Sequence, residues 1–195
     1  MRRTRTGRYE FRCFAPALAD MRLQIEGAGV AIEREQRDET YLITPQPDPD
    51  FNIKFRAGCL EVKLRERTLR GLEFWRHIHT VLLPIDGQTL SAICSEALGR
   101  APQITRDRGL DCTDVVSLVE AAGIARGVDV FKDRRRIKID GGLAEITNLK
   151  TEMAAVETAA VEAADPEATA RLRAAFGLAS ATNESYPAYL GRAIA

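Results

Sequence analysis

Four basic side chains occupy alternate positions within one short segment of the chain, residues 128–140. The segment is rich in β-branched and aromatic residues at its start and ends at Asp140-Gly141-Gly142, a pattern typical of a hairpin turn. The period of a strand places these four side chains on one face: Lys132, Arg134, Arg136 and Lys138. Lysine and arginine bind phosphate oxygens, arginine through paired hydrogen bonds. Such a face needs bulk water, a polyanion or a facing set of carboxylates. For this strand alone a solvated basic face is the favoured interpretation, and the hypothesis of an anion-binding face depends on other strands with the same pattern.

Other segments show the same alternation of charged and apolar residues. Residues 51–56 and 59–65, joined by a short glycine turn, form the clearest hairpin pattern in the sequence. Residues 9–14 alternate in the same way, and residues 143–149 are the expected hairpin partner of the cationic segment. With a further strand expected at 156–162, these segments place the following charges on one side: Glu10, Arg12, Lys54, Arg56, Glu61, Lys63, Arg65, Lys132, Arg134, Arg136, Lys138, Glu145 and Glu162.

So many charges of both signs cannot share a dry core, because their desolvation would cost too much free energy. A closed antiparallel barrel with a water-filled bore would accommodate them. An amphipathic sheet with one wet face is the simpler alternative. Helical patterns occur at 17–28, 87–99, 114–122 and 165–176, the last of which starts with Asp-Pro-Glu. The expected fold class is therefore α+β, mainly an antiparallel β-barrel with peripheral helices.

The composition limits the partners and the compartment of this chain. Lys plus Arg and Asp plus Glu both number 28 in 195 residues, so any anion site must be local. The four cysteines show no metal-ligand spacing, and no apolar run approaches the roughly 20 residues that span a bilayer. We expect one cytoplasmic domain, residues 1–195, with a basic tail at 1–8. Residues 33–39 are a charged run before a strand expected at 40–44.

Several short motifs, in their order along the chain, are similar to those of one family. They are Tyr9-Glu10-Phe11-Arg12, Asn52-Ile53-Lys54-Phe55-Arg56 with Leu60-Glu61-Val62-Lys63, Lys132-Asp133-Arg134-Arg135-Arg136, Gly142-Leu143-Ala144-Glu145-Ile146-Thr147, Val161-Glu162-Ala163-Ala164-Asp165-Pro166-Glu167-Ala168 and Asn183-Glu184-Ser185-Tyr186-Pro187. This set resembles the CYTH-like branch of the triphosphate tunnel metalloenzymes. The resemblance implies an eight-stranded antiparallel tunnel that binds a triphosphate and one or two divalent ions, Mg²⁺ or Mn²⁺. Family activities include inorganic triphosphatase, thiamine triphosphatase, RNA triphosphatase and class IV adenylyl cyclase.

The resemblance also implies roles for the charged residues. The expected phosphate-binding residues are Arg12, Lys54, Arg56, Lys63, Arg65, Lys132, Arg134 and Arg136. The expected metal ligands are Glu10, Glu145 and Glu162, of which Glu145 and Glu162 are also the expected catalytic residues. Hard divalent ions prefer such carboxylate oxygens and bridge to phosphates.

Two carboxylates of the family pattern are replaced in this chain. The family opens with Glu-x-Glu-x-Lys and often ends with Glu-x-Glu, whereas here Glu10 and Glu162 are the single acids that match. Two hypotheses follow: a metal-dependent triphosphatase, or a polyphosphate- or nucleotide-binding module of the same fold without turnover. RNA binding ranks last, because the net charge is zero and few aromatic residues alternate with the basic ones. The expected partner is a triphosphate or polyphosphate, without a membrane, and a homodimer is left open.

Overall fold

Eight antiparallel strands form a closed barrel in the computed structural model, which describes residues 7–28, 30–105 and 108–194. The strands are β1 (Arg8–Ala15), β2 (Glu33–Ile43), β3 (Phe51–Arg56), β4 (Cys59–Leu69), β5 (Leu72–Leu82), β6 (Arg126–Ile139), β7 (Gly142–Lys150) and β8 (Ala155–Ala163). The helices are α1 (Ala19–Gly27), α2 (Gly87–Leu98), α3 (Cys112–Ala121), α4 (Pro166–Ala175) and α5 (Tyr186–Ile194). The expected α+β barrel is confirmed.

The order of strands around the barrel is β1-β5-β4-β3-β2-β6-β7-β8, with β8 pairing again with β1. Short hairpins connect β3 to β4 and β6 to β7, where the sequence predicted them. In the second hairpin, Asp140 and Gly141 both adopt positive φ, which is the backbone of a two-residue turn that follows the twist of the strands. Of the expected basic tail, residues 1–6 lie outside the described residues and Arg8 begins β1.

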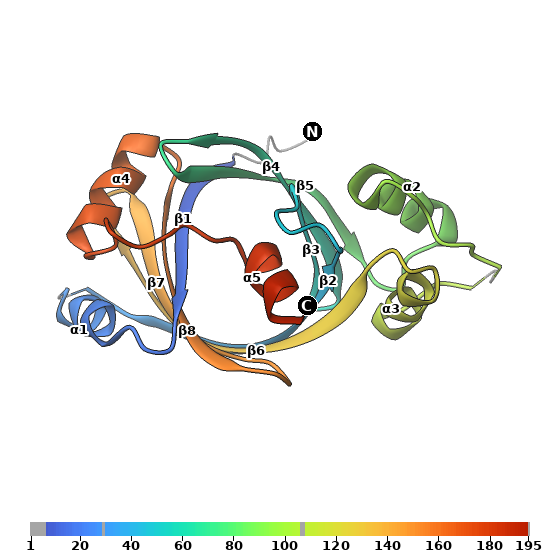
Figure 1. The fold of residues 1–195 in the computed structure, drawn as a ribbon, viewed down its shortest axis with the longest axis horizontal. Coiled ribbons are helices and arrows are strands. Elements are labelled where there is room, and N and C mark those ends of the chain that lie inside the picture. Colours follow the sequence, from blue (N-terminus) through green and yellow to red (C-terminus); the bar gives the residue numbers. More distant parts are fainter. Residues whose placement is uncertain (1–6, 29, 106–107, 195) are drawn as a thin grey trace.

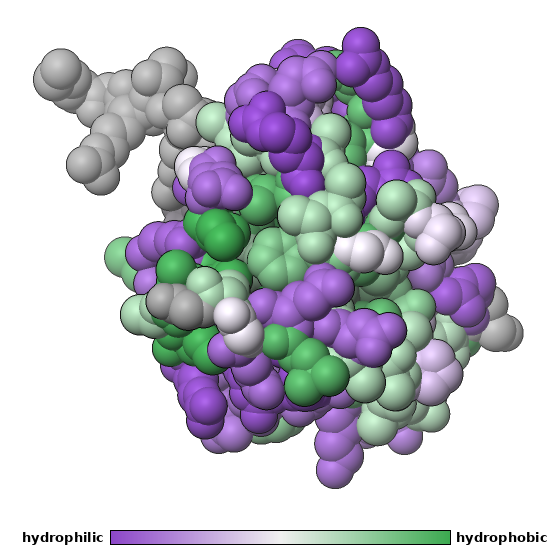
Figure 2. Space-filling model, turned by 90° about the vertical axis from the view of Figure 1, so that its left-hand side faces the viewer, coloured by the Kyte–Doolittle hydropathy of each residue, from purple (hydrophilic) through white to green (hydrophobic). Residues whose placement is uncertain are grey.

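Helices lie against the outside of the barrel (Figure 1), and apolar side chains of the strands pack against them. Helices α2 and α3 pack on β3 and β4 through a cluster that includes Leu60, Val62, Leu90 and Val115. Helices α1 and α4 cover β1, β7 and β8 on the other side. Figure 2 views the molecule from that side, where hydrophilic and hydrophobic residues are interspersed on the surface. Because the helices bury the outer face, the inner face is left to the charged residues.

Helices α2, α3 and α4 begin where the sequence provides capping residues. The side chain of Asp165 accepts a hydrogen bond from Ala168 N at 3.0 Å, and Pro166 follows at the first helical position of α4. Asp86 caps α2 and Asp111 caps α3 in the same way. None of the helices in the described residues is long and apolar enough to cross a membrane.

Helix α5 differs from the others, because it covers one end of the bore instead of the outer wall (Figure 1). Its residues Tyr186, Tyr189 and Leu190 pack among the first residues of β6 and the last residues of β2 and β7. The rings of Phe14 and Tyr189 stack with centroids 4.0 Å apart. The preceding segment is tied to β1 by a hydrogen bond of 2.8 Å from Arg12 N to Asn183 Oδ1. We call the part of the bore next to α5 its closed end.

Candidate functional site

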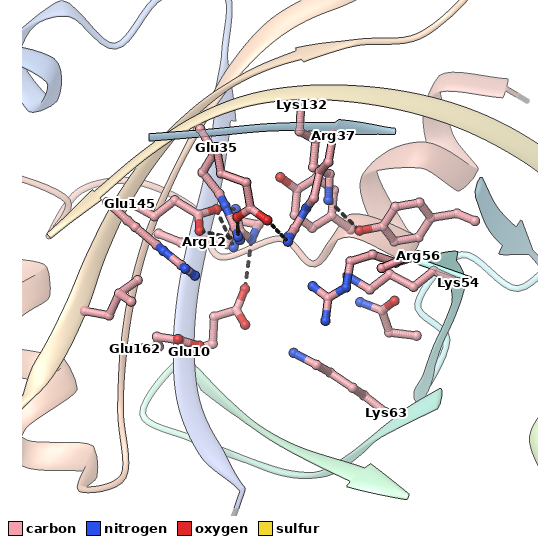
Figure 3. A pocket seen from close by; sticks show the side chains of 18 of the residues that line it. Glu10, Arg12, Glu35, Arg37, Lys54, Arg56, Lys63, Lys132, Glu145 and Glu162 are labelled. Carbon is pink, nitrogen blue, oxygen red and sulfur yellow. Dashed lines mark hydrogen bonds and ion pairs between the residues drawn. The ribbon is translucent and has the colours of Figure 1, made fainter. Parts of the chain in front are cut away.

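A cavity of about 760 Å³ occupies the bore of the barrel. Eight lysine and arginine side chains of the described residues line it, against five carboxylate side chains. The basic set is Arg12, Arg37, Lys54, Arg56, Lys63, Lys132, Arg134 and Arg136. Figure 3 shows six of them, Arg12, Arg37, Lys54, Arg56, Lys63 and Lys132, which come from β1, β2, β3, β4 and β6 and point into the cavity. The excess of positive charge in a confined space favours an anion with several negative charges.

The inner cluster, at the closed end of the bore, is a group of cations around one carboxylate. Glu39 Oε2 accepts hydrogen bonds from Lys132 Nζ at 2.7 Å and from the hydroxyl of Tyr41 at 2.9 Å. Lys54 Nζ lies 3.2 Å from the same carboxylate and Arg37 Nε lies 2.8 Å from it. Lys132 Nζ also lies 3.6 Å from the centroid of the Tyr186 ring.

The charges of the inner cluster are unbalanced. Burial raises the pKa of Glu39, but the charges of Lys132 and Lys54 outweigh it and hold the pKa well below its usual value. Burial lowers the pKa of Lys54 to about 8, against the raising effect of Glu39. Burial and the nearby Lys54 also hold the pKa of Lys132 well below its usual value. Each lysine would therefore gain free energy from a further anion in the cavity.

In the middle of the bore, two arginines hold one carboxylate. Arg134 Nη1 lies 3.0 Å from Glu145 Oε2, and Arg12 Nη1 lies 3.4 Å from Glu145 Oε1. Arg134 also contacts Glu35 of β2. Burial raises the pKa of Glu145, yet Arg12 and Arg134 lower it overall to about 2. Glu145 is therefore ionised at neutral pH, and both of its oxygens are engaged.

The outer cluster, toward the opposite end of the bore, brings two carboxylates together. Glu10 of β1 and Glu162 of β8 are directly opposite each other in the strand register. Burial and the charge of Glu10 raise the pKa of Glu162, whereas Arg12 and Lys63 outweigh burial and lower the pKa of Glu10. Arg8 Nη1 lies 3.1 Å from Glu162 Oε1. Two acids that repel each other in this way form a site suited to a cation.

The outer cluster also fits the donor requirements of the expected Mg²⁺ or Mn²⁺. Mg²⁺ keeps several waters and commonly takes one or two protein carboxylates together with phosphate oxygens. Glu10 and Glu162 supply that number, and hard oxygen donors suit either ion. No group of three His, Cys, Asp or Glu side chains within the described ranges is arranged to hold an ion alone. Glu145, the third expected ligand, is bound by Arg12 and Arg134 instead.

The structure brings together almost all of the residues that the sequence indicated. The following predicted residues line the cavity: Glu10, Arg12, Lys54, Arg56, Lys63, Lys132, Arg134, Arg136, Glu145 and Glu162. Arg65 lies outside this lining. Its guanidinium contacts Asp48 at 2.6 Å, Asp50 at 2.9 Å and Glu73 at 2.9 Å. The first two acids belong to the proline-rich turn before β3, so Arg65 fastens that turn to the barrel.

Strand β2 contributes residues that the sequence analysis missed. The charged run at 33–39 is the first half of this strand and pairs with β6 along its whole length. Its inward side chains neutralise the cations of β6: Glu33 contacts Arg136, Glu35 contacts Arg134 and Glu39 contacts Lys132. The alternation Glu33, Glu35, Arg37, Glu39 was the available signal, because it has the period of a strand.

Comparisons with known proteins identify the fold. No protein-family model matches the sequence, and no curated protein matches it. Among solved structures, a conserved hypothetical protein from Pyrococcus furiosus superposes with a TM-score of 0.55 at 13% identity, over 92% of this chain and 98% of that one.

Two further solved structures carry functional descriptions. A candidate adenylate cyclase from Bacillus halodurans superposes with a TM-score of 0.53 at 9% identity, over 94% of this chain and 97% of that one. A candidate adenylyl cyclase from Hippeastrum, described as having a dominant triphosphatase activity, gives a TM-score of 0.52 at 14% identity, over 95% of each chain. With the closed eight-stranded barrel, these matches confirm that the chain has a CYTH-like fold.

Proposed function

We propose that this protein binds a triphosphate-containing compound in its bore and hydrolyses it with Mg²⁺ or Mn²⁺. The ligand would be inorganic triphosphate or an organic or nucleoside triphosphate. The observation that carries the proposal is the lining of the cavity, in which eight basic side chains outnumber five carboxylates. Neighbours described as a candidate adenylate cyclase and as a protein with triphosphatase activity support the same class of ligand.

We infer a role for each region of the bore. Lys54 and Lys132 bind phosphate oxygens at the closed end, and Arg12 and Arg134 bind them in the middle. Glu10 and Glu162 would hold the divalent ion, which supplies positive charge to the phosphate oxygens when it is bound.

One carboxylate of the outer cluster is suited to proton transfer. Glu162 is the proposed proton acceptor for an attacking water, because it pairs with the half-exposed Arg8, whereas Glu145 is held by the two buried arginines Arg12 and Arg134. Glu145 keeps Arg12 and Arg134 aligned toward the phosphate chain through the contacts already described. We therefore assign proton transfer to Glu162 and positioning of the two arginines to Glu145.

The second candidate function is binding of the same anion without turnover. The specific observation that favours it is the state of Glu145, whose two oxygens are held by arginines. Glu10 and Glu162 are each paired with one arginine as well, Arg12 at 2.8 Å and Arg8 at 3.1 Å, so an ion would compete with these cations. A weakly held ion would support anion binding more than phosphoryl transfer.

Phosphate release from tripolyphosphate, ATP and thiamine triphosphate, with Mg²⁺, Mn²⁺ or EDTA, separates the two candidates. We expect metal-dependent release that falls strongly in Glu145→Gln and binding that weakens about tenfold or more in Arg134→Ala. Arg70→Ala is the matched control, because this exposed arginine pairs with Glu167 outside the bore. Absence of turnover, together with a rise in melting temperature on adding tripolyphosphate, would assign the binding function. Unchanged kinetics in both variants would remove the site assignment.

A further inference from the structure

A second depression, of about 590 Å³, adjoins the bore at the end opposite α5. It shares Arg136, Leu143 and Glu162 with the lining of the bore, so the two spaces are continuous. The rest of its wall comes from Arg8 at the start of β1 and from the β6–β7 hairpin, residues 138–142. We call this depression the rim pocket. The cavity that binds the anion thus continues past the end of the barrel.

Three cations line the rim pocket together with the carboxylates of Asp140 and Glu162, and these cations form only exposed or half-buried ion pairs. Arg8, Arg136 and Lys138 line it, and the side chains of Arg8 and Lys138 are 53% and 76% exposed. Lys138 Nζ lies 2.8 Å from Glu33 Oε1, and Arg136 Nε lies 2.8 Å from Glu33 Oε2, so one carboxylate serves two cations. Exposed ion pairs of this kind stabilise a protein by at most about 1 kcal/mol. An anionic ligand can therefore compete for these side chains.

Basic side chains occupy every second position of β6 from the closed end of the bore to the rim pocket. Lys132 lies in the inner cluster, Arg134 and Arg136 line the bore, and Lys138 reaches the rim pocket. From Lys132 to Lys138 the strand rises about 20 Å, at 3.3 Å per residue. This row of basic side chains is longer than a triphosphate. A triphosphate bound at the closed end would therefore not reach the outermost cations of the row.

The chemistry of the rim pocket does not suit a nucleoside. Its lining in the described residues consists of Arg8, Arg136, Lys138, Ile139, Asp140, Gly141, Gly142, Leu143 and Glu162. This set contains no aromatic ring, and proteins commonly bind bases by stacking on aromatic rings. A chain of further phosphates, by contrast, would meet the three exposed or half-buried cations.

We propose that the rim pocket is a subsite for the fourth and later phosphates of a linear inorganic polyphosphate, so that longer chains are preferred to tripolyphosphate and to nucleotides. This inference rests on the proposed anion-binding function and names its substrate class. Arg8 and Lys138 are the residues that distinguish long chains from short ones. They lie beyond the inner cluster, which binds the end of either ligand.

Isothermal titration in EDTA, with tripolyphosphate, a longer linear polyphosphate and ATP, tests the inference on the full chain. For the wild type we expect the longer polyphosphate to bind more tightly than tripolyphosphate or ATP. For the double variant Arg8→Ala, Lys138→Ala we expect affinity for the longer chain to fall roughly tenfold, with tripolyphosphate unchanged within about twofold. Lys138→Ala alone leaves the Arg8–Glu162 pair intact and should give a smaller loss. Lys150→Ala, an exposed lysine at the other end of β7, is the control.

Each other outcome has a definite meaning. Equal losses for the long and short chains, or no loss for either, would overturn the rim subsite and leave the proposed function standing. A wild type that binds ATP as tightly as the longer chain, with ATP affinity lowered in the double variant, would assign the rim pocket to the nucleoside and overturn the inference. A wild type that binds none of the three anions would instead remove the proposed function itself.

Discussion

The inner and outer clusters of the bore differ in the sign of the charges that they gather. At the closed end, Glu39 contacts Lys54, Lys132 and Arg37, of which Arg37 also pairs with Glu35 at 3.0 Å. Toward the other end, Glu10 and Glu162 face each other. The inner cluster has more cations than carboxylates, whereas the outer cluster places two carboxylates side by side, paired with Arg12 and Arg8. A phosphate chain would add negative charge to the inner cluster, and a divalent ion would bind between the two carboxylates of the outer cluster.

In both clusters, burial and a neighbouring like charge shift pKa values toward the neutral form, but they act on different groups. In the inner cluster, burial and neighbouring cations depress the pKa of both lysines, while Glu39 stays ionised. In the outer cluster, burial and a neighbouring acid raise the pKa of Glu162. The outer cluster can therefore take up a proton where an ion is absent, whereas the carboxylate of the inner cluster keeps its charge. The clusters should respond differently to mutation and to pH.

The largest effect is expected from Glu39→Gln, which removes the only carboxylate of the inner cluster. Leaving buried cations without a counter-charge should lower the free energy of unfolding by about 3–5 kcal/mol. Tripolyphosphate should raise the melting temperature more in the variant than in the wild type, because its oxygens replace the lost carboxylate. Denaturant unfolding and thermal melting measure both quantities, and Glu26→Gln on the exposed face of α1 is the control. A variant as stable as the wild type would contradict the account of the inner cluster.

A smaller effect on the free energy of unfolding, opposite in sign to that of Glu39→Gln, is expected from Glu162→Gln in the outer cluster. The raised pKa of Glu162 means that the folded protein binds this proton more tightly than the unfolded chain does. Without ligand, wild-type stability should therefore increase as the pH falls through that raised value toward the ordinary 4.5. The variant should lack this increase, and its Mg²⁺ affinity should fall about tenfold.

Unfolding measured across this pH range, with a Mg²⁺ titration at neutral pH, checks the prediction for Glu162→Gln. Glu152→Gln, in the exposed turn between β7 and β8, should behave like the wild type. The same pH dependence in wild type and Glu162→Gln would locate the titrating group elsewhere.

The smallest effect on ligand binding is expected on β4, from Arg65→Ala. Its three carboxylate partners hold Arg65 outside the cavity, so tripolyphosphate affinity should change less than about twofold. Lys63→Ala, two positions earlier and in the lining of the cavity, should weaken binding about threefold. Titration calorimetry on the two variants compares them directly. A larger loss of tripolyphosphate affinity in Arg65→Ala than in Lys63→Ala would show that Arg65 contributes to phosphate binding.

Much of the barrel follows from local patterns in the sequence. The alternation in residues 51–56 and 128–139 fixes which side chains face inward, and the turn residues Asp140 and Gly141 fix one hairpin. Asp165 and Pro166 likewise predict the start of α4. These features depend on a few neighbouring residues, so the sequence alone contains enough information to identify them.

Other features depend on partners that are distant in the chain. Residues 33–39 have low strand propensity, and pairing with β6, which places Arg136 opposite Glu33 and Arg134 opposite Glu35, makes them a strand. Arg65 shares a face with Lys63 by period, but a register shift just after it and the acids of a distant turn redirect its side chain. The contact of Glu10 with Glu162 requires the register between the first and last strands, which no local pattern specifies.

That register has a consequence for how the chain folds. The pairing of β1 with β8 brings together Arg8 and Glu162, which are 154 positions apart in the chain. Closing so long a loop lowers the entropy of the chain, and this cost is offset only when the two strands have paired. The sheet from β2 to β7 can pair through nearer neighbours, whereas β1 is the first strand to be synthesised and has to wait for β8. The two acids of the outer cluster meet only in a chain whose barrel has closed, so the outer cluster is complete only after the first and last strands have paired.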